Sequence, residues 1–138
     1  MTVPASGTDG ALVLCIDDDM TGLKVRRLLL ERAGFSVLCA QSDEDGLQLF
    51  TELPIDLVLT DHFLKSGTGT EIARKMKEIK PNVPVLIFSA TLDVPKDIRF
   101  ADEFLAKSGD PERLLTTVAR LLRKRRYHAP VQENVSAL

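Results

Sequence analysis

The sequence predicts an α/β fold in which one parallel sheet carries helices on both faces. Five short apolar runs follow one another along the chain, at residues 12–16, 36–40, 56–60, 85–89 and 103–106. Uninterrupted apolar runs of this length are typical of strands that are buried on both faces. Amphipathic helical patterns fill most of the intervals, and right-handed crossovers would return each helix over the sheet. The alternation therefore predicts five βα units in a single open sheet.

Each predicted helix has a residue that favours its start or its end. Helices are expected at residues 20–33, 43–53, 68–79 and 110–124. Gly34 follows the first of them, as glycine commonly does at a helix end. Ser42 is a good N-cap for the second, and Thr68 with Glu71 has the spacing of a capping box. Asp110 supplies an N-cap for the last helix, which carries a regular stripe of leucines.

The interval between the fourth and fifth predicted strands departs from this pattern. Residues 91–102 contain Pro95 and little periodicity, so we expect a short or irregular fourth crossover instead of a full helix. The chain ends are also irregular, because residues 1–10 are rich in Gly, Ser, Thr and Pro and residues 127–138 lack a pattern. We therefore expect a folded domain over residues 11–126, between a disordered N-terminus and a flexible C-terminal tail.

Length and composition favour a single soluble domain. The chain has 138 residues, of which 44% are hydrophobic and 28% charged, and this suits one compact core. Its net charge of −2 argues against a protein that holds nucleic acid by bulk electrostatics. The sequence shows neither a secretory signal nor an apolar run that could cross a membrane, so a cytoplasmic location is expected. Cys15 and Cys39 are expected to be buried free thiols.

Acidic and other polar residues follow the predicted strands at their carboxyl ends. They are Asp17, Asp18 and Asp19 after the first strand, Asp61 after the third, Ser89 at the end of the fourth and Lys107 after the fifth. In open parallel sheets, function collects at the carboxyl ends of the strands, near the switch in strand order. If the first and third strands are neighbours, the acids that follow them face one another.

A cluster of carboxylates at one edge of a sheet requires a compensating cation, since an unpaired charge is costly to bury. Oxygen ligands of this kind suit Mg²⁺, which commonly bridges a protein carboxylate and a phosphate. A hydroxyl from Ser89 and an ammonium from Lys107 would serve the remaining oxygens of a phosphoryl group. An aspartate can itself accept the phosphoryl group, so the set predicts a phosphoryl-transfer site.

With these residues in this order, the sequence resembles a response-regulator receiver domain of two-component signalling. The matching residues are Asp17-Asp18 after VLCI, Asp61 after DLVLT, Gly69 in the following loop, Ser89-Ala90 after VLIF and Lys107 after FLA. The resemblance spans residues 11–124 and implies a flavodoxin-like (βα)5 sheet with strand order 2-1-3-4-5. It also implies a stand-alone receiver, which is no enzyme but a signalling phosphoacceptor that phosphorylates itself and slowly dephosphorylates itself.

Carried over residue by residue, the resemblance implies a phosphoacceptor and a metal site. Asp61 would accept a phosphoryl group from the phosphohistidine of a sensor histidine kinase or a histidine phosphotransfer protein. Asp18, Asp61 and the main-chain carbonyl of Phe63 would hold Mg²⁺, and Asp17 would act through a metal-bound water. A downstream protein is the expected further partner, and homodimer formation stays open. Direct binding to nucleic acid or to a membrane is not expected.

The resemblance also implies a switch. After transfer, Ser89 would hydrogen-bond the phosphoryl oxygens and Lys107 would pair with them. Phe104 stands where the family has an aromatic side chain that turns inward on phosphorylation, which would change the surface around the fourth and fifth strands. Ser108 follows Lys107 where the family has a proline whose preceding bond is often cis, so either a trans or a strained peptide bond is expected between these two residues.

Two alternatives stay open on the sequence. The fold could serve as an interaction module that is never phosphorylated, which the departures at Ser108 and at 91–102 favour. Asp17-Asp18-Asp19-Met20-Thr21 also fits the DxDxT motif of haloacid-dehalogenase-like phosphatases, in which Asp17 would be the nucleophile. Beside the site, His62 is expected to be a surface side chain. The basic run 123–126 is expected to be a solvated helix end.

Overall fold

The strands of the main sheet are parallel and follow the predicted order. The computed structural model describes residues 10–91 and 93–137, with side chains as far as Arg125. Its five parallel strands are β1 (Leu12–Ile16), β2 (Ser36–Ala40), β3 (Leu57–Thr60), β6 (Val85–Ser89) and β7 (Glu103–Ala106). They pair in the order β2-β1-β3-β6-β7, which in the chain order of these strands is the predicted 2-1-3-4-5. Ala40 and Thr60 both lie opposite Ile16, so β1 ends between its two neighbours.

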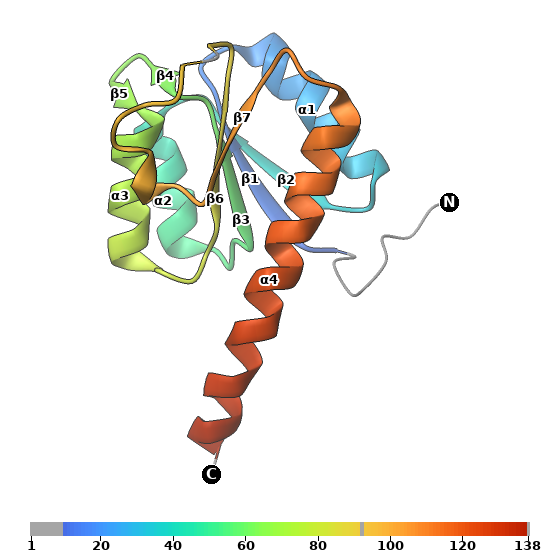
Figure 1. The fold of residues 1–138 in the computed structure, drawn as a ribbon, viewed down its shortest axis with the longest axis vertical. Helices are drawn as coiled ribbons and strands as arrows, with labels where there is room; N and C mark the ends of the chain where they lie inside the picture. The colour runs from blue at the N-terminus through green and yellow to red at the C-terminus, as the bar shows by residue number, and fades with distance from the viewer. Residues whose placement is uncertain (1–9, 92, 138) are drawn as a thin grey trace.

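Helices cover both faces of this sheet (Figure 1). They are α1 (Met20–Arg32), α2 (Asp43–Glu52), α3 (Gly69–Ile79) and α4 (Pro111–Ala137). α1 and α4 lie on one face and α2 and α3 on the other, so the sheet is the middle layer of three. The predicted flavodoxin-like architecture is therefore confirmed. Most of the segment expected to be disordered, residues 1–9, lies outside the described residues.

The residues predicted to bound the helices do so. Ser42, Thr68 and Asp110 each accept a hydrogen bond from a backbone N–H in the first helical turn that follows, at 3.1, 3.3 and 3.0 Å. Asp19 caps α1 in the same way, accepting from the N–H of Thr21 at 3.2 Å. Gly34 follows α1 with a φ of 100°, a conformation that glycine adopts without strain. These bonds satisfy donors that every helix start leaves free.

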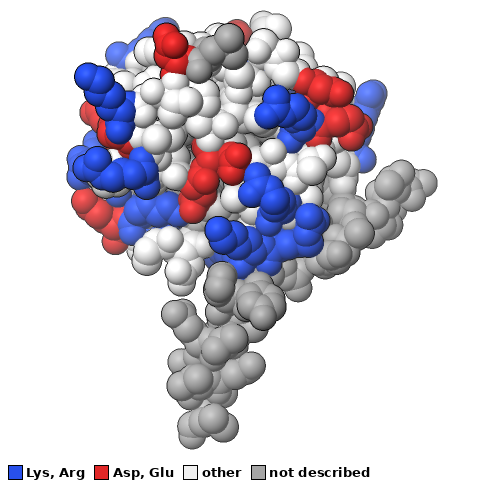
Figure 2. Space-filling view, in the orientation of Figure 1, with Lys and Arg blue, Asp and Glu red and all other residues white. Residues whose placement is uncertain are grey.

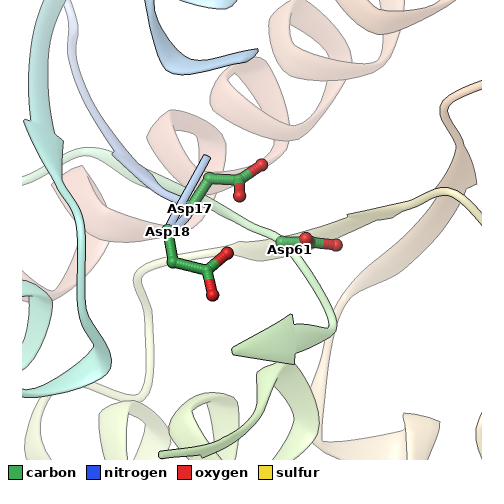
Figure 3. Close-up of side chains that lie close together, drawn as sticks. All are labelled: Asp17, Asp18 and Asp61. Carbon is green, nitrogen blue, oxygen red and sulfur yellow. The ribbon is translucent and has the colours of Figure 1, made fainter. Parts of the chain in front are cut away.

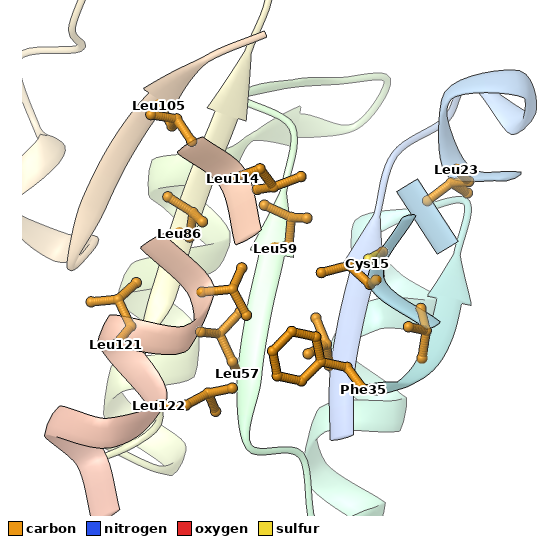
Figure 4. Packing of buried hydrophobic residues seen from close by; sticks show 14 residues of the cluster. Cys15, Leu23, Phe35, Leu57, Leu59, Leu86, Leu105, Leu114, Leu121 and Leu122 are labelled. Carbon is orange, nitrogen blue, oxygen red and sulfur yellow. The ribbon is translucent and has the colours of Figure 1, made fainter. Parts of the chain in front are cut away.

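Two apolar layers hold the sheet in place. Along β1, Val13 and Cys15 belong to the layer beneath α1 and α4, while Leu14 and Ile16 belong to the layer beneath α2 and α3. Figure 4 shows the first layer, in which Leu114, Leu121 and Leu122 of α4 lie over Leu57, Leu59, Leu86 and Leu105 of the sheet. Burying a side chain of this size stabilises a fold by about 1.5–3 kcal/mol, so these layers fix the strand ends that carry the acids.

Helix α4 is longer than the sequence predicts. A helix was expected over 110–124 and a flexible tail from 127, but α4 continues to Ala137. The segment after residue 126 lacks an apolar stripe and contains Pro130, and both features argue against a helix. Adding residues to an existing helix nevertheless costs less than starting a new one. The packed leucines in the earlier turns of α4 stabilise the helix from which this extension proceeds.

The fourth crossover is short, as predicted. Among the described residues between β6 and β7, the structure has a single turn of 3-10 helix, η1 (Ile98–Phe100). Phe100 and Ala101 pack against the layer beneath α2 and α3. Asp102 accepts a hydrogen bond from the N–H of Val85 at 2.7 Å. These contacts anchor the crossover without a full helix.

Both cysteines are free thiols, as predicted, and they lie opposite each other on β1 and β2. Cys15 is buried, whereas Cys39 is only half-buried. Burial raises the pKa of the Cys15 thiol to about 12, and burial also raises the pKa of Cys39. Both thiols are therefore protonated at neutral pH, which makes them poor nucleophiles.

Charged side chains of both signs are interspersed on the face seen in Figure 2. Arg120 pairs with Glu103 at 3.1 Å, and Arg125 pairs with Asp56 at 2.7 Å. Arg125 of the predicted basic run 123–126 thus binds an acid of its own chain. Within the part of the chain that the structure describes, no helix has both the length and the apolar character that a membrane span requires.

Candidate functional site

The acids of two neighbouring strand ends meet at one edge of the sheet, as predicted. Asp17 follows β1 and donates its N–H to the carbonyl of Ala40 at 3.1 Å, and Asp61 follows β3 and donates to that of Ile16 at 3.0 Å. These bonds extend the sheet ladder by one residue on each strand. Ligand oxygens of Asp17, Asp18 and Asp61 all lie within 4.8 Å of one another. Figure 3 shows their carboxylates directed to the same side.

Asp17 is the most enclosed of the three acids. Only 1% of its surface is exposed. Its Oδ1 accepts a hydrogen bond from the N–H of Asp19 at 2.9 Å. Its Oδ2 accepts hydrogen bonds from the Arg26 guanidinium and from Lys107 Nζ, the latter at 3.1 Å. The buried charge is therefore paired with two cations, which offsets the cost of removing the carboxylate from water.

Asp61 faces the same lysine from the next strand. Its side chain is 14% exposed, so a group from solvent can reach it. Its Oδ1 accepts a hydrogen bond from the N–H of His62 at 2.8 Å, and its Oδ2 lies 3.5 Å from Lys107 Nζ. Lys107 thus bridges the acids that follow β1 and β3, and Asp18 lies half-buried beside them.

Ser89 and Lys107 lie together at the ends of β6 and β7. Ser89 is fully buried, and its Oγ accepts a hydrogen bond from the N–H of Thr91 at 3.4 Å. Its carbonyl accepts one from the N–H of Lys107 at 2.7 Å. No cis peptide bond occurs among the described residues, so the bond between Lys107 and Ser108 is trans, one of the two outcomes that the sequence left open. Phe104 is half-buried on the same strand that leads to Lys107.

The loop after Asp61 contains a hairpin that the sequence does not predict. Its strands β4 (Phe63–Leu64) and β5 (Gly67–Thr68) pair in antiparallel fashion, and strands of two residues carry no periodic signature. The side chain of Phe63 is 60% exposed on this hairpin. After the hairpin, Gly69 returns the chain to the start of the loop, since its N–H donates to the carbonyl of His62 at 2.7 Å. A Cβ at Gly69 would lie 2.6 Å from the carbonyl oxygen of Asp61, so this close approach requires glycine.

His62 is buried, and the prediction of a surface side chain was wrong. The residue is 8% exposed, and its ring packs edge-on against Phe63 with the centroids 4.8 Å apart. In the described structure, the buried Nδ1 of His62 has no hydrogen-bond partner. The hydrogen bonds that the backbone of His62 makes with Asp61 and Gly69 set the path of the loop and turn this side chain inward.

Arg26 is a site residue that the strand-end motifs do not reveal. It is 7% exposed and hydrogen-bonds Oδ2 of Asp17. Helical spacing contains a signal for it, because Leu23, Arg26 and Leu30 are the buried residues of α1. An arginine on the buried stripe of a helix needs an acidic partner, and three acids, Asp17 to Asp19, directly precede that helix.

The donor set fits Mg²⁺. Three carboxylates offer oxygen ligands within 4.8 Å of one another, and oxygen is the donor that Mg²⁺ takes in proteins. Among the side chains that the structure describes, Lys107 and Arg26 are the two cations paired with this cluster, so three carboxylates keep a net negative charge that favours a further cation. Asp18 and Asp61 are half-buried and therefore less enclosed than Asp17, which leaves their oxygens more accessible to an ion from solvent.

Comparison with known proteins places these observations in a family. A sequence model described as the response regulator receiver domain matches residues 13–119. The receiver domain protein from Clostridium thermocellum, known from a crystal structure, is 32% identical, with a TM-score of 0.79 over 85% of this chain and 98% of that one. The fold is shared with the response regulator TrrA from Thermotoga maritima in complex with Mg²⁺ and BeF. TrrA is 23% identical, with a TM-score of 0.77 over 80% of this chain and 98% of that one.

A curated relative agrees with the structural neighbours. The cell cycle transcriptional regulator CtrA of Caulobacter vibrioides is 26% identical over 121 residues, which are 85% of this chain and 52% of CtrA. This chain thus spans about half the length of CtrA. The cluster of Asp17, Asp18 and Asp61 resembles the Mg²⁺ and phosphoacceptor site of receivers, and these matches give no support to the phosphatase alternative. With most of its length matched, the chain belongs to the response regulator receiver domain family.

Proposed function

We propose that this receiver domain accepts a phosphoryl group on Asp61 from a sensor histidine kinase or a histidine phosphotransfer protein. The observation that carries the proposal is the cluster of Asp17, Asp18 and Asp61 within 4.8 Å, with Lys107 against it. Such a set combines a nucleophile, oxygen ligands for a metal and a cation for phosphoryl oxygens, which is what phosphoryl transfer requires. The role that follows is signalling in the cytoplasm, where a downstream protein reads the phosphorylated state.

Mg²⁺ is the proposed cofactor. Asp18, Asp61 and the main-chain carbonyl of Phe63 would hold the ion, and Asp17 would act through a bound water. When bound, Mg²⁺ would neutralise the charge that the carboxylates and the phosphoryl oxygens bring together. Asp17 suits the indirect role, because both of its oxygens already accept hydrogen bonds from the protein.

The residues of the site divide the transfer step among them. A carboxylate oxygen of Asp61 attacks phosphorus, so that a P–O bond forms while the P–N bond of the phosphohistidine breaks and the imidazole nitrogen keeps the electron pair. Lys107, 3.5 Å from Oδ2 of Asp61, would then pair with the phosphoryl oxygens. Its 3.1 Å pair with Asp17 keeps the lysine at the site before the phosphoryl group arrives.

A groove beside the site offers a surface for the partner that delivers the phosphoryl group. It has a volume of about 340 Å³, lies between α1 and the start of α4, and includes Val25, Phe88, Lys107 and Pro111 in its lining. Val25 is 63% exposed, so it offers apolar surface to a partner within this groove. A mainly apolar groove whose lining includes Lys107 suits a partner whose own apolar side chains flank the phosphohistidine.

Ser89 and Phe104 would convert phosphorylation into a change of surface. Ser89 is fully buried at the end of β6, and Phe104 is half-buried on the adjacent strand β7. We expect the variant Ser89→Ala to keep the adduct on Asp61 but to lose most of the phosphorylation-dependent chemical-shift changes around Phe104. Amide NMR spectra with and without acetyl phosphate measure this, and equal changes in wild type and variant would contradict the switch.

Intact-mass spectrometry after incubation with acetyl phosphate tests the proposed function. We expect a single phosphoryl adduct with Mg²⁺ and none after EDTA removes the metal, because the clustered acids repel a phosphate dianion. An absent adduct despite calorimetrically detected Mg²⁺ binding would favour the interaction module that is never phosphorylated. Continued turnover of a phosphate ester by the purified chain would favour an enzyme.

A further inference from the structure

Helix α1 brings a buried arginine into the acidic site. The side chain of Arg26 is 9% exposed, and it pairs with Oδ2 of Asp17, the same oxygen that Lys107 binds at 3.1 Å. The guanidinium carbon also lies 5.5 Å from the ring centroid of Phe88. Arg26 is therefore fixed from two sides, by a carboxylate and by an aromatic face.

The helix leaves space for this arginine at Gly22. An ideal Cβ at Gly22 would lie 2.9 Å from the terminal nitrogen of Arg26 and 3.2 Å from Oδ2 of Asp19. Glycine inside a helix is destabilising relative to alanine, so its presence within α1 calls for a structural reason. The reason that the geometry supplies is room for the guanidinium between α1 and Asp17.

We propose that Arg26 is a resident cation of the acidic site, which stabilises the metal-free cluster and competes electrostatically with Mg²⁺. Three carboxylates face two cations, so one net negative charge remains with Arg26 present and two would remain without it. Arg26 acts as a positioning residue through Asp17 and not by contact with the phosphoryl group. The inference rests on the proposed Mg²⁺ site but concerns its affinity, not the identity of the phosphoacceptor.

Two effects of opposite direction follow from removing Arg26. The variant Arg26→Met should be less stable than wild type without Mg²⁺, because Asp17 keeps its burial and loses one of its cations. The same variant should bind Mg²⁺ more tightly, by about tenfold, because the cluster gains one unit of negative charge. If Arg26 served only to pack α1, its replacement would lower stability without raising the affinity for Mg²⁺.

The variants are chosen to separate charge from packing. Arg26→Lys keeps the charge, so its Mg²⁺ affinity should stay close to that of wild type. Gly22→Ala keeps Arg26 but displaces its guanidinium. This variant should therefore raise the affinity for Mg²⁺, as Arg26→Met does. Arg27→Met is the matched control, because Arg27 is 53% exposed on the same helix and pairs with Glu31 instead of the cluster.

Calorimetric titration of each full-length variant with MgCl₂ tests the inference, with urea unfolding in EDTA as the second readout. The expected result is tighter binding in Arg26→Met and Gly22→Ala, and no change in Arg27→Met or Arg26→Lys. Unchanged or weaker binding in a folded Arg26→Met, or tightening by an equal amount in Arg27→Met, would overturn it. If Arg26→Met does not fold, Gly22→Ala decides in the same way. An absence of Mg²⁺ binding in wild type would overturn the metal site itself, and the inference with it.

Discussion

Replacing Asp61 by asparagine is expected to abolish the phosphoryl adduct that acetyl phosphate and Mg²⁺ produce. The amide oxygen of asparagine can still accept the hydrogen bond from the N–H of His62, 2.8 Å long in the structure, so the loop should keep its path. The neutral amide is too weak a nucleophile to attack phosphorus and a poorer ligand for Mg²⁺ than a carboxylate. Intact-mass spectrometry of wild type and variant measures the loss.

The matched control for this variant is Asp45→Asn. Asp45 is exposed in the first turn of α2 and is not a member of the cluster, so its replacement should leave the adduct unchanged. Asp17→Asn separates the two candidate nucleophiles. An adduct that survives in Asp61→Asn but disappears in Asp17→Asn would contradict Asp61 as the acceptor and return the assignment to Asp17.

Replacing Gly69 by alanine is expected to lower the free energy of unfolding by about 2–3 kcal/mol, because the new Cβ overpacks a tight turn. That Cβ would lie 2.6 Å from the carbonyl oxygen of Asp61 and 3.0 Å from Cα of His62. Both are backbone atoms, so they cannot rotate away as the end of a side chain can. The loop must shift instead, and the carboxylate of Asp61 shifts with it. Adduct formation should therefore fall together with stability.

Gly67→Ala is the control within the same hairpin. The atom nearest to a Cβ at Gly67 is a carboxylate oxygen of Glu71 at 3.6 Å, which is an ordinary contact. Its replacement should change stability by no more than about 0.5 kcal/mol. Urea unfolding of both variants provides the comparison. A Gly69→Ala protein as stable as Gly67→Ala and phosphorylated at the wild-type rate would contradict the close approach between Gly69 and Asp61.

The strands and the acidic cluster could be predicted because they depend on local patterns and on one rule of topology. Buried strands of a parallel sheet are continuous apolar runs, and the predicted limits depart from the observed ones only in the third strand, which starts at Leu57 instead of Asp56. The carboxylate of Asp56 turns instead to the N–H of Leu12 at 2.8 Å. Once β1 and β3 are neighbours, the acids after them must meet.

Other features depend on packing between distant segments, which a single sequence does not display. The burial of His62 follows from the hairpin of β4 and β5, whose strands of two residues are too short to give a pattern. Arg26 was missed because arginine usually lies in solvent, although Gly22 one turn earlier is the sign that its side chain is enclosed. The extent of α4 was missed because helices extend cooperatively past residues of poor propensity.

The most direct test of the central claim is to locate the phosphoryl group on the chain. Borohydride reduces an aspartyl phosphate to homoserine, and peptide mass spectrometry then identifies the position. After incubation with acetyl phosphate and Mg²⁺, we predict homoserine at position 61 and at no other aspartate, and none after incubation with EDTA. Homoserine at position 17, or a chain that binds Mg²⁺ yet yields no homoserine at all, would contradict the assignment of Asp61 as the phosphoacceptor.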